Sequence, residues 1–207
     1  MLNIKKIPRA LLAVITLVII CGLMASAYVG RIMYIKKYGI HINPTEVISA
    51  KNVEFFLQND DRWKDDYLGK SKYKIGGYGC LLSIIASVCN DLGYETNPKD
   101  LNILLTENEG FTSSGEIIWY KINETVPDIY YDYKRIFNSG TIMKDLENGY
   151  LPIVMVKYHG TGYQHWVLVV GANKDDFLII DPLNKNKEIV PLNTHGKVYY
   201  YRVLKNK

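Results

Sequence analysis

An uninterrupted run of uncharged residues from Ala10 to Gly30 constrains this chain more than any other feature of it. In a helix that rises about 1.5 Å per residue, its 21 residues reach about 30 Å, the thickness of the hydrocarbon core of a bilayer. The run has no polar face, whereas a surface helix of a soluble domain keeps one. We therefore predict one transmembrane helix or an export signal ahead of the folded part of the chain.

Two outcomes are open for this run. Ala25-Ser26-Ala27 has the small-x-small form of a signal-peptidase cleavage site, but the run continues to Gly30, which favours a retained anchor. Basic residues flank both ends, so the positive-inside rule does not orient the helix, whereas the very short N-terminal segment favours export of the C-terminal domain. We expect a single-pass protein of the cell membrane with this domain outside the cell, or a secreted domain if cleavage occurs after Ala27.

The rest of the chain has the composition of one globular domain. We divide the chain into a short basic segment (1–9), the anchor or signal peptide (10–30), a juxtamembrane linker (31–50) and the domain (51–207). Hydrophobic residues make up 48% and charged residues 22%, which excludes a disordered chain. The net charge of +4 comes from scattered lysines without interleaved aromatics, and no glycine-rich phosphate loop or dinucleotide fingerprint is present. We expect neither a nucleic-acid nor a nucleotide partner.

The domain begins with helices and ends with strands. Apolar periodicity and capping residues predict helices over 80–92, 97–106, 113–124 and 141–148, with Asn97 as an N-cap before Pro98. Short β-branched or aromatic runs predict strands over 151–156, 166–171, 177–181 and 198–203. This segregation predicts an α+β domain with an antiparallel sheet.

Cys80 is the candidate nucleophile because it begins the first predicted helix. Unpaired N–H groups and the helix dipole favour a thiolate there. Gly77 and Gly79 just before it allow a substrate to approach the backbone closely. A structural free cysteine is the alternative. The helical period places Cys80 on a polar stripe with three other side chains, those of Ser83, Ser87 and Asn90.

The other two cysteines are not expected to react. Cys89 belongs to the buried side of the helix, and nine residues at about 100° each place it opposite Cys80, which excludes a disulfide between them. Cys21 lies in the apolar run and is expected to act as a small hydrophobe.

His165 is the candidate base. It opens a strongly apolar strand, which would hold the imidazole still. His159, in a glycine-rich loop, is its chief competitor, and a structural role for His165 is the alternative. His41 and His195 are expected to be solvated surface residues.

Asp181 and Gln58 complete the candidate site. Asp181 ends the strand that we pair with the His165 strand, so it should emerge near His165 and accept its second ring N–H; a simple turn aspartate before Pro182 is the alternative. Gln58 could donate its side-chain amide to an oxyanion together with the Cys80 N–H, and a surface amide is the alternative. Zinc would need three or four ligands with close pairs, and we find none, so no metal or other cofactor is expected.

Five segments carry a resemblance to a known family: QNDDRW, GYGC, LENGYLPIVMV, HWVLVVG and IIDP. In this order and spacing they resemble the peptidases of clan CA, family thirty-nine, which are papain-superfamily relatives of the bacteriocin-processing peptidases that remove double-glycine leaders. The resemblance spans about Val53 to Leu204. It implies a papain-like fold, in which the nucleophile begins a helix packed on a C-terminal antiparallel sheet.

The resemblance also implies the roles of single residues. Cys80 matches the nucleophile, His165 the general base, Asp181 the orienting residue and Gln58 the oxyanion-hole amide. Two features depart from the pattern: Leu81-Leu82 stand where relatives commonly have small residues, and Gln58 lies 22 residues before Cys80, a longer interval than in close papain relatives.

These observations predict a membrane-anchored, extracytoplasmic cysteine peptidase that acts on a peptide or protein substrate. Two functions remain open beside it. The domain could be a catalytically silent module that holds a peptide in its groove, which Leu81-Leu82 would favour, or an acyl transferase or transpeptidase that uses the same thiol. The leader-removing role of transporter-fused relatives is not expected here, because we find no nucleotide-binding domain and only one apolar span.

Overall fold

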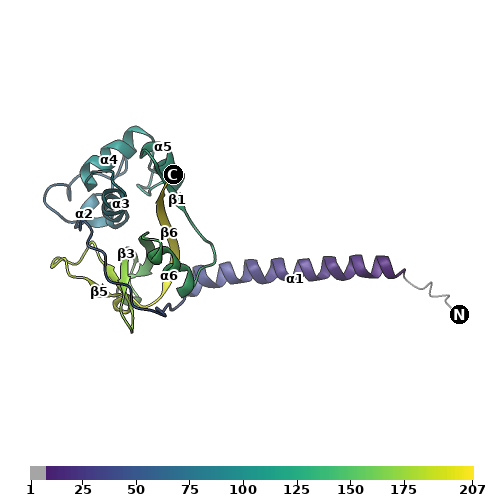
Figure 1. Ribbon diagram of the computed structural model, residues 1–207. Helices are drawn as coiled ribbons and strands as arrows, with labels where there is room; N and C mark the ends of the chain where they lie inside the picture. Colours follow the sequence, from purple (N-terminus) through teal and green to yellow (C-terminus); the bar gives the residue numbers. More distant parts are fainter. Residues whose placement is uncertain (1–7) are drawn as a thin grey trace.

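Helix α1 (Arg9–Tyr38) extends away from the rest of the chain in the computed structural model, which describes residues 8–207 (Figure 1). Its apolar window has a mean hydropathy of 2.6 and is 0% buried, so this helix is long and apolar enough to cross a membrane. Most of the basic segment 1–9 lies outside the described residues.

The helical part of the domain agrees with the prediction apart from the short helix α2, which the sequence pattern did not indicate, and the later start of α5. Its helices are α2 (Ile75–Tyr78), α3 (Cys80–Asp91), α4 (Pro98–Glu107), α5 (Trp119–Thr125) and α6 (Ser139–Glu147). Asn97 caps α4 as predicted, by accepting the N–H groups of Lys99 and Asp100. The helix predicted over 113–124 begins only at Trp119, because the residues before it form a turn in which Gly115 has a φ of +78°.

All six strands form one antiparallel sheet in the order β1-β6-β2-β3-β4-β5. The strands are β1 (Ile129–Asp132), β2 (Pro152–Lys157), β3 (Gln164–Ala172), β4 (Phe177–Ile180), β5 (Val190–Pro191) and β6 (Val198–Asn206). Two 3₁₀ turns lie beside them, η1 (Tyr158–Gly160) and η2 (Leu192–Thr194). The α+β architecture is therefore confirmed, with β1 and β5 as strands that the sequence pattern did not indicate.

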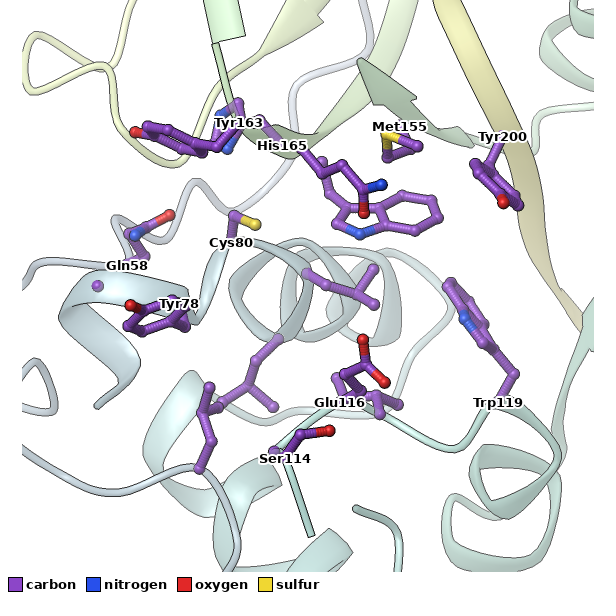
Figure 2. A pocket seen from close by; sticks show the side chains of 18 of the residues that line it. Gln58, Tyr78, Cys80, Ser114, Glu116, Trp119, Met155, Tyr163, His165 and Tyr200 are labelled. Atoms are coloured by element: carbon purple, nitrogen blue, oxygen red, sulfur yellow. The ribbon is translucent and has the colours of Figure 1, made fainter. Parts of the chain in front are cut away.

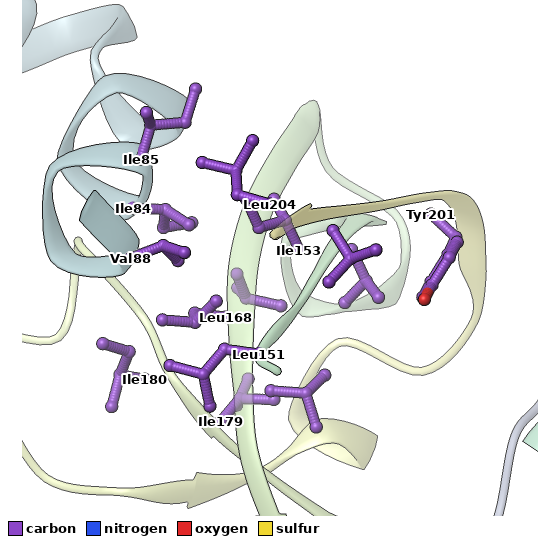
Figure 3. Close-up of a cluster of buried hydrophobic side chains, with 14 of the residues drawn as sticks. Ile84, Ile85, Val88, Leu151, Ile153, Leu168, Ile179, Ile180, Tyr201 and Leu204 are labelled. Carbon is purple, nitrogen blue, oxygen red and sulfur yellow. The ribbon is translucent and has the colours of Figure 1, made fainter. Parts of the chain in front are cut away.

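Helix α3 is the centre of the core and packs on β3. Figure 3 shows Ile84 and Val88 of α3 facing the side of Leu168 and its neighbours on the strands. Every residue from Leu82 to Cys89 is buried, so the predicted polar stripe through Ser83 and Ser87 is wrong as a surface feature. The helix is enclosed on all sides by other elements, and the Ser87 hydroxyl donates to the Ser83 carbonyl at 3.1 Å instead of to water.

The segment 31–50, expected to be a linker, is packed on this domain. Its first part continues α1, and Ile35 in the last turn is only 1% exposed. Gly39 ends the helix with a φ of +64° and donates its N–H to the Ile35 carbonyl. The chain then pairs with the sheet twice, because Ile40 bridges to β6 and Ile48 bridges to β3. The end of α1 is therefore attached to the sheet and is not joined to the domain by a flexible linker.

Candidate active site

The start of α3 is set by a break in the helix before it. Gly79 separates α2 from α3, and a Cβ at this position would lie 2.6 Å from the Ile75 carbonyl oxygen. Gly79 is thus required by close packing within the protein, and not by the approach of a substrate as the sequence suggested. Gly77 has open space where its Cβ would be, which is what a residue facing a bound ligand needs.

This break leaves the backbone around Cys80 ready for an anion. In a continuous helix the Cys80 N–H would bond to the Gly76 carbonyl, but that oxygen accepts a hydrogen bond from the Gln58 side-chain amide at 2.9 Å. Within residues 8–207, the N–H groups of Cys80, Leu81 and Leu82 have no acceptor. These donors and the helix dipole stabilise negative charge at the thiol or on a carbonyl oxygen beside it.

The two cysteines of α3 differ as the sequence predicted. Cys80 is half-buried at the first turn, whereas Cys89 is 0% exposed. Burial raises the pKa of the Cys89 thiol to about 12, which keeps it protonated and inert.

His165, the second residue of β3, lies against Cys80 and is 1% exposed (Figure 2). Its Nε2 lies 2.6 Å from Oδ1 of Asp181. Burial alone would lower the pKa of the imidazole, but the Asp181 carboxylate and the Cys80 thiol together raise it to about 9. The ring therefore contacts the thiol on one side and a carboxylate on the other.

Asp181 comes directly after β4 and is held by three donors. Besides His165, its Oδ1 accepts the Leu183 N–H at 2.8 Å, and its Oδ2 lies 3.2 Å from Nε2 of His195. Burial opposes ionisation of this carboxyl, but the two imidazoles outweigh it and hold the pKa of Asp181 well below its ordinary range. The carboxylate stays charged and directed at His165.

His195 is the residue of this group that the sequence analysis missed. It is not a solvated surface residue, since only 2% of it is exposed. Its Nδ1 accepts the backbone N–H of His159 at 3.1 Å, so the proton of the neutral ring is on Nε2, the nitrogen that faces Asp181. One sequence signal could have indicated this contact: His159-Gly160 and His195-Gly196 are both His-Gly pairs, in loops that pack against each other through their glycines.

Gln58 is also buried, with 2% exposed. Its backbone N–H donates to the Pro182 carbonyl at 3.1 Å, which ties it to the residue after Asp181. Its Nε2 has one hydrogen left after the bond to Gly76, and its Oε1 has no partner within the described chain. Gln58 and Cys80 line the same cleft.

The cleft has a volume of about 830 Å³. Figure 2 shows Cys80 toward one end of it, and Trp119 and Tyr200 at the other. Leu81 and Leu82 line the cleft without closing it, and Leu82 is 1% exposed because it belongs to the core. Across residues 8–207 no group of three or more acidic, histidine or cysteine side chains is arranged to hold a metal ion.

Comparisons with known proteins bear on the family and the fold of this chain. The model of the peptidase C39 family matches residues 72–200, which include Cys80, His165 and Asp181 but not Gln58. The crystal structure of a C39-like peptidase from Bacillus anthracis superimposes with a TM-score of 0.54 at 14% identity, over 78% of this chain and 98% of that one. At such low identity the likeness shows the fold alone, and it confirms the fold expected from the sequence. No curated protein matches the chain.

Proposed function

This chain belongs to the peptidase C39 family, and from that premise we propose that it is a cysteine peptidase whose reacting groups are Cys80, His165, Asp181 and Gln58. One observation carries the proposal above the others. A buried imidazole contacts a thiol at a helix start and an ionised carboxylate, and this is the arrangement that nucleophilic catalysis by cysteine requires. Metals play no part in the proposal.

The proposed reaction proceeds through an acyl-enzyme. The Cys80 thiolate attacks the carbonyl carbon of the scissile amide, and the oxygen takes up the electron pair of the C=O bond. The Cys80 N–H and the remaining Nε2 hydrogen of Gln58 would donate to that oxyanion. The imidazolium of His165 gives its proton to the leaving amine as the C–N bond breaks, and then takes a proton from the water that hydrolyses the thioester. Asp181 keeps the ring oriented throughout.

We place the enzyme at a membrane, anchored by α1, with its domain outside the cell. The length and apolar surface of α1 support the anchor. Cleavage after Ala27 would release a chain that still contains Ile35 and the sheet contacts of segment 31–50.

The silent binding module gains no support from the residues that suggested it. Leu81 and Leu82 leave the cleft open next to the thiol, and the Cys80 side chain lines that cleft. No contact in the described chain favours an acyl transferase over a hydrolase either.

A peptide-based thiol-reactive probe on the full chain in detergent tests the proposal. We expect wild type and Cys89→Ala to be labelled at Cys80 within minutes, and Cys80→Ala not to be labelled. Membrane peptides compared by mass spectrometry between a deletion strain carrying wild type and one carrying Cys80→Ala would then identify the substrate. If Cys80→Ala restored every phenotype of the deletion, catalysis would have to be abandoned.

A further inference from the structure

At the end of the cleft away from Cys80 lies a guanidinium that has no counter-ion within residues 8–207. Arg202 of β6 lines the cleft and is half-buried. It donates one hydrogen bond, from Nη1 to the Tyr201 carbonyl at 2.7 Å, while its buried Nε has no partner within residues 8–207. No carboxylate of the described chain lies within 4.0 Å of it, although a guanidinium has five N–H donors.

Aromatic rings surround this charge without neutralising it. The guanidinium carbon lies 4.5 Å from the ring centre of Tyr133, 5.5 Å from that of Trp119 and 6.0 Å from that of Tyr200. A cation–π contact is weaker than the pair of charge-assisted hydrogen bonds that a bidentate carboxylate would form with the same guanidinium. The rings thus restrict the position of the guanidinium while the side chain stays partly exposed.

The neighbouring charges leave this end of the cleft positive. Lys36, near the end of α1, holds its Nζ 5.9 Å from the ring centre of Tyr200. The nearest acids on β1 and α6, Asp132 and Asp145, are both paired with Lys205. Glu116 also lines the cleft, but it is exposed and keeps its hydration.

We propose that Arg202 binds a carboxylate of the peptide substrate, with Trp119 and Tyr200 packing against the aliphatic part of the residue that bears it. The proposal rests on the function proposed above and names a substrate class for it: peptides that carry a carboxylate several residues away from the bond that is cut. Arg202 contacts the rings of Trp119 and Tyr200, and these two residues lie at the end of the cleft opposite Cys80 (Figure 2). That carboxylate belongs to an aspartate or glutamate side chain or to a free C-terminus. A planar guanidinium with unused donors matches both.

Binding to a variant that cannot cleave tests the site apart from catalysis. The full chain with Cys80→Ala is titrated, in detergent, with fluorescein-labelled hexapeptides in matched pairs that have Glu or Gln at one position. The same peptides with free and with amidated C-termini separate the two sources of the carboxylate. We expect at least one pair, or one free and amidated pair, to differ by about 10-fold or more in Kd by fluorescence anisotropy.

Three variants in the Cys80→Ala background assign that preference to Arg202. Arg202→Met keeps the stem that packs on the rings and should abolish the preference. Arg202→Lys should retain part of it, which provides a second route if the methionine variant does not fold. Arg135→Met is the matched control, because Arg135 donates to the Tyr133 hydroxyl but does not line the cleft; it should leave the preference unchanged.

The outcomes separate the two proposals. Equal affinity for both members of every pair, no binding of any peptide, or a preference that survives in Arg202→Met would each overturn the carboxylate site. A preference that depends on Arg202, in a protein whose wild type is never labelled at Cys80 and cleaves none of these peptides, would support the site and overturn the peptidase.

Discussion

The two halves of the candidate active site are built differently. On the sheet, His165, Asp181 and His195 are each less than 10% exposed and are connected to one another and to the backbone by hydrogen bonds. On the helical side, Cys80 is half-buried, and the N–H groups around it have no acceptor in the described chain. The groups that hold charge are fixed by strands and turns, whereas the group that would touch the substrate remains accessible at a helix start.

The difference suggests how the roles are divided. A buried, fully bonded carboxylate and imidazole keep their geometry without a substrate, so they act as a preorganised electrostatic support. In the proposed reaction, the N–H groups at the start of α3, which have no acceptor within residues 8–207, would donate to the carbonyl oxygen as it becomes negative. Substitutions on the two sides should therefore change different quantities.

The largest effect is expected for Asp181→Asn on the sheet side. The imidazole loses its charged partner, and an amide NH₂ facing Nε2 favours the wrong tautomer, so kcat should fall by about 10²–10⁴-fold. The measurement is steady-state cleavage of a substrate peptide, with Asp175→Asn in the exposed loop after β3 as the control. A fall of less than 10-fold would show that the carboxylate does not orient the base.

Gln58→Ala tests the helical side. If its amide donates to the oxyanion, kcat should fall by about 10²–10³-fold while KM changes little, because that bond forms only in the transition state. The Gly76 carbonyl loses its donor in the same variant, so a thermal unfolding curve is needed beside the kinetics. A rise in KM at constant kcat would mean that Gln58 binds substrate instead.

His195 should have a smaller effect than either. His195→Leu removes the second donor to Asp181, and we expect a loss in kcat of about 10-fold with a changed pH profile, because the Asp181 charge and the His165 pKa depend on each other. His195→Gln can accept from the His159 N–H and donate to Asp181, and it should restore most of the rate. His159→Asn keeps the backbone donor and the left-handed turn, so it serves as the control. Equal losses in the leucine and glutamine variants would leave His195 a packing role only.

A different quantity, the stability of the fold against pH, tests the charges on the sheet side. The folded pKa of His165, about 9, lies above the ordinary 6.5, so its contribution is fully present below pH 6.5 and is lost as the pH rises through 9. Asp181 has a lowered pKa, so its contribution is present above about pH 4 and is lost as the pH falls further. Denaturant unfolding should therefore show greatest stability between about pH 4 and 6.5, with a loss of roughly 3 kcal/mol by pH 10. His165→Gln should reduce the loss of unfolding free energy between pH 6.5 and pH 10. An unchanged loss in this variant would contradict the assignment to His165.

Sequence patterns predicted the parts of this site that depend on local features of the chain, such as a helix start or a hairpin between consecutive strands. Cys80 could be placed because a helix start is a local feature, and Asp181 could be placed near His165 because β3 and β4 form a hairpin whose register is determined by two short strands. The pattern of α3 misled on its polar side, since Ser83 and Ser87 are enclosed by elements that are distant in the sequence.

His195 and the bonding of Gln58 could not be predicted in the same way. His195 lies in a polar loop with no local periodicity, and it is buried only because the η1 and η2 turns meet beyond the ends of their strands. The bond from Gln58 to Gly76 joins residues 18 apart across an irregular segment. Contacts of this kind depend on the whole fold rather than on a repeating pattern.

The burial of Ile35 has a mechanical consequence for a protein held in a bilayer. Ile35, a side chain buried in the domain core, comes only five positions after the end of the apolar run at Gly30, which is about 7.5 Å along the helix. A domain attached this rigidly to its membrane helix would not change its orientation freely above the lipid, as a domain on a flexible linker would. Its cleft would stay at a fixed height and tilt relative to the bilayer. A peptide bond would then be cut only if the substrate holds it at that height.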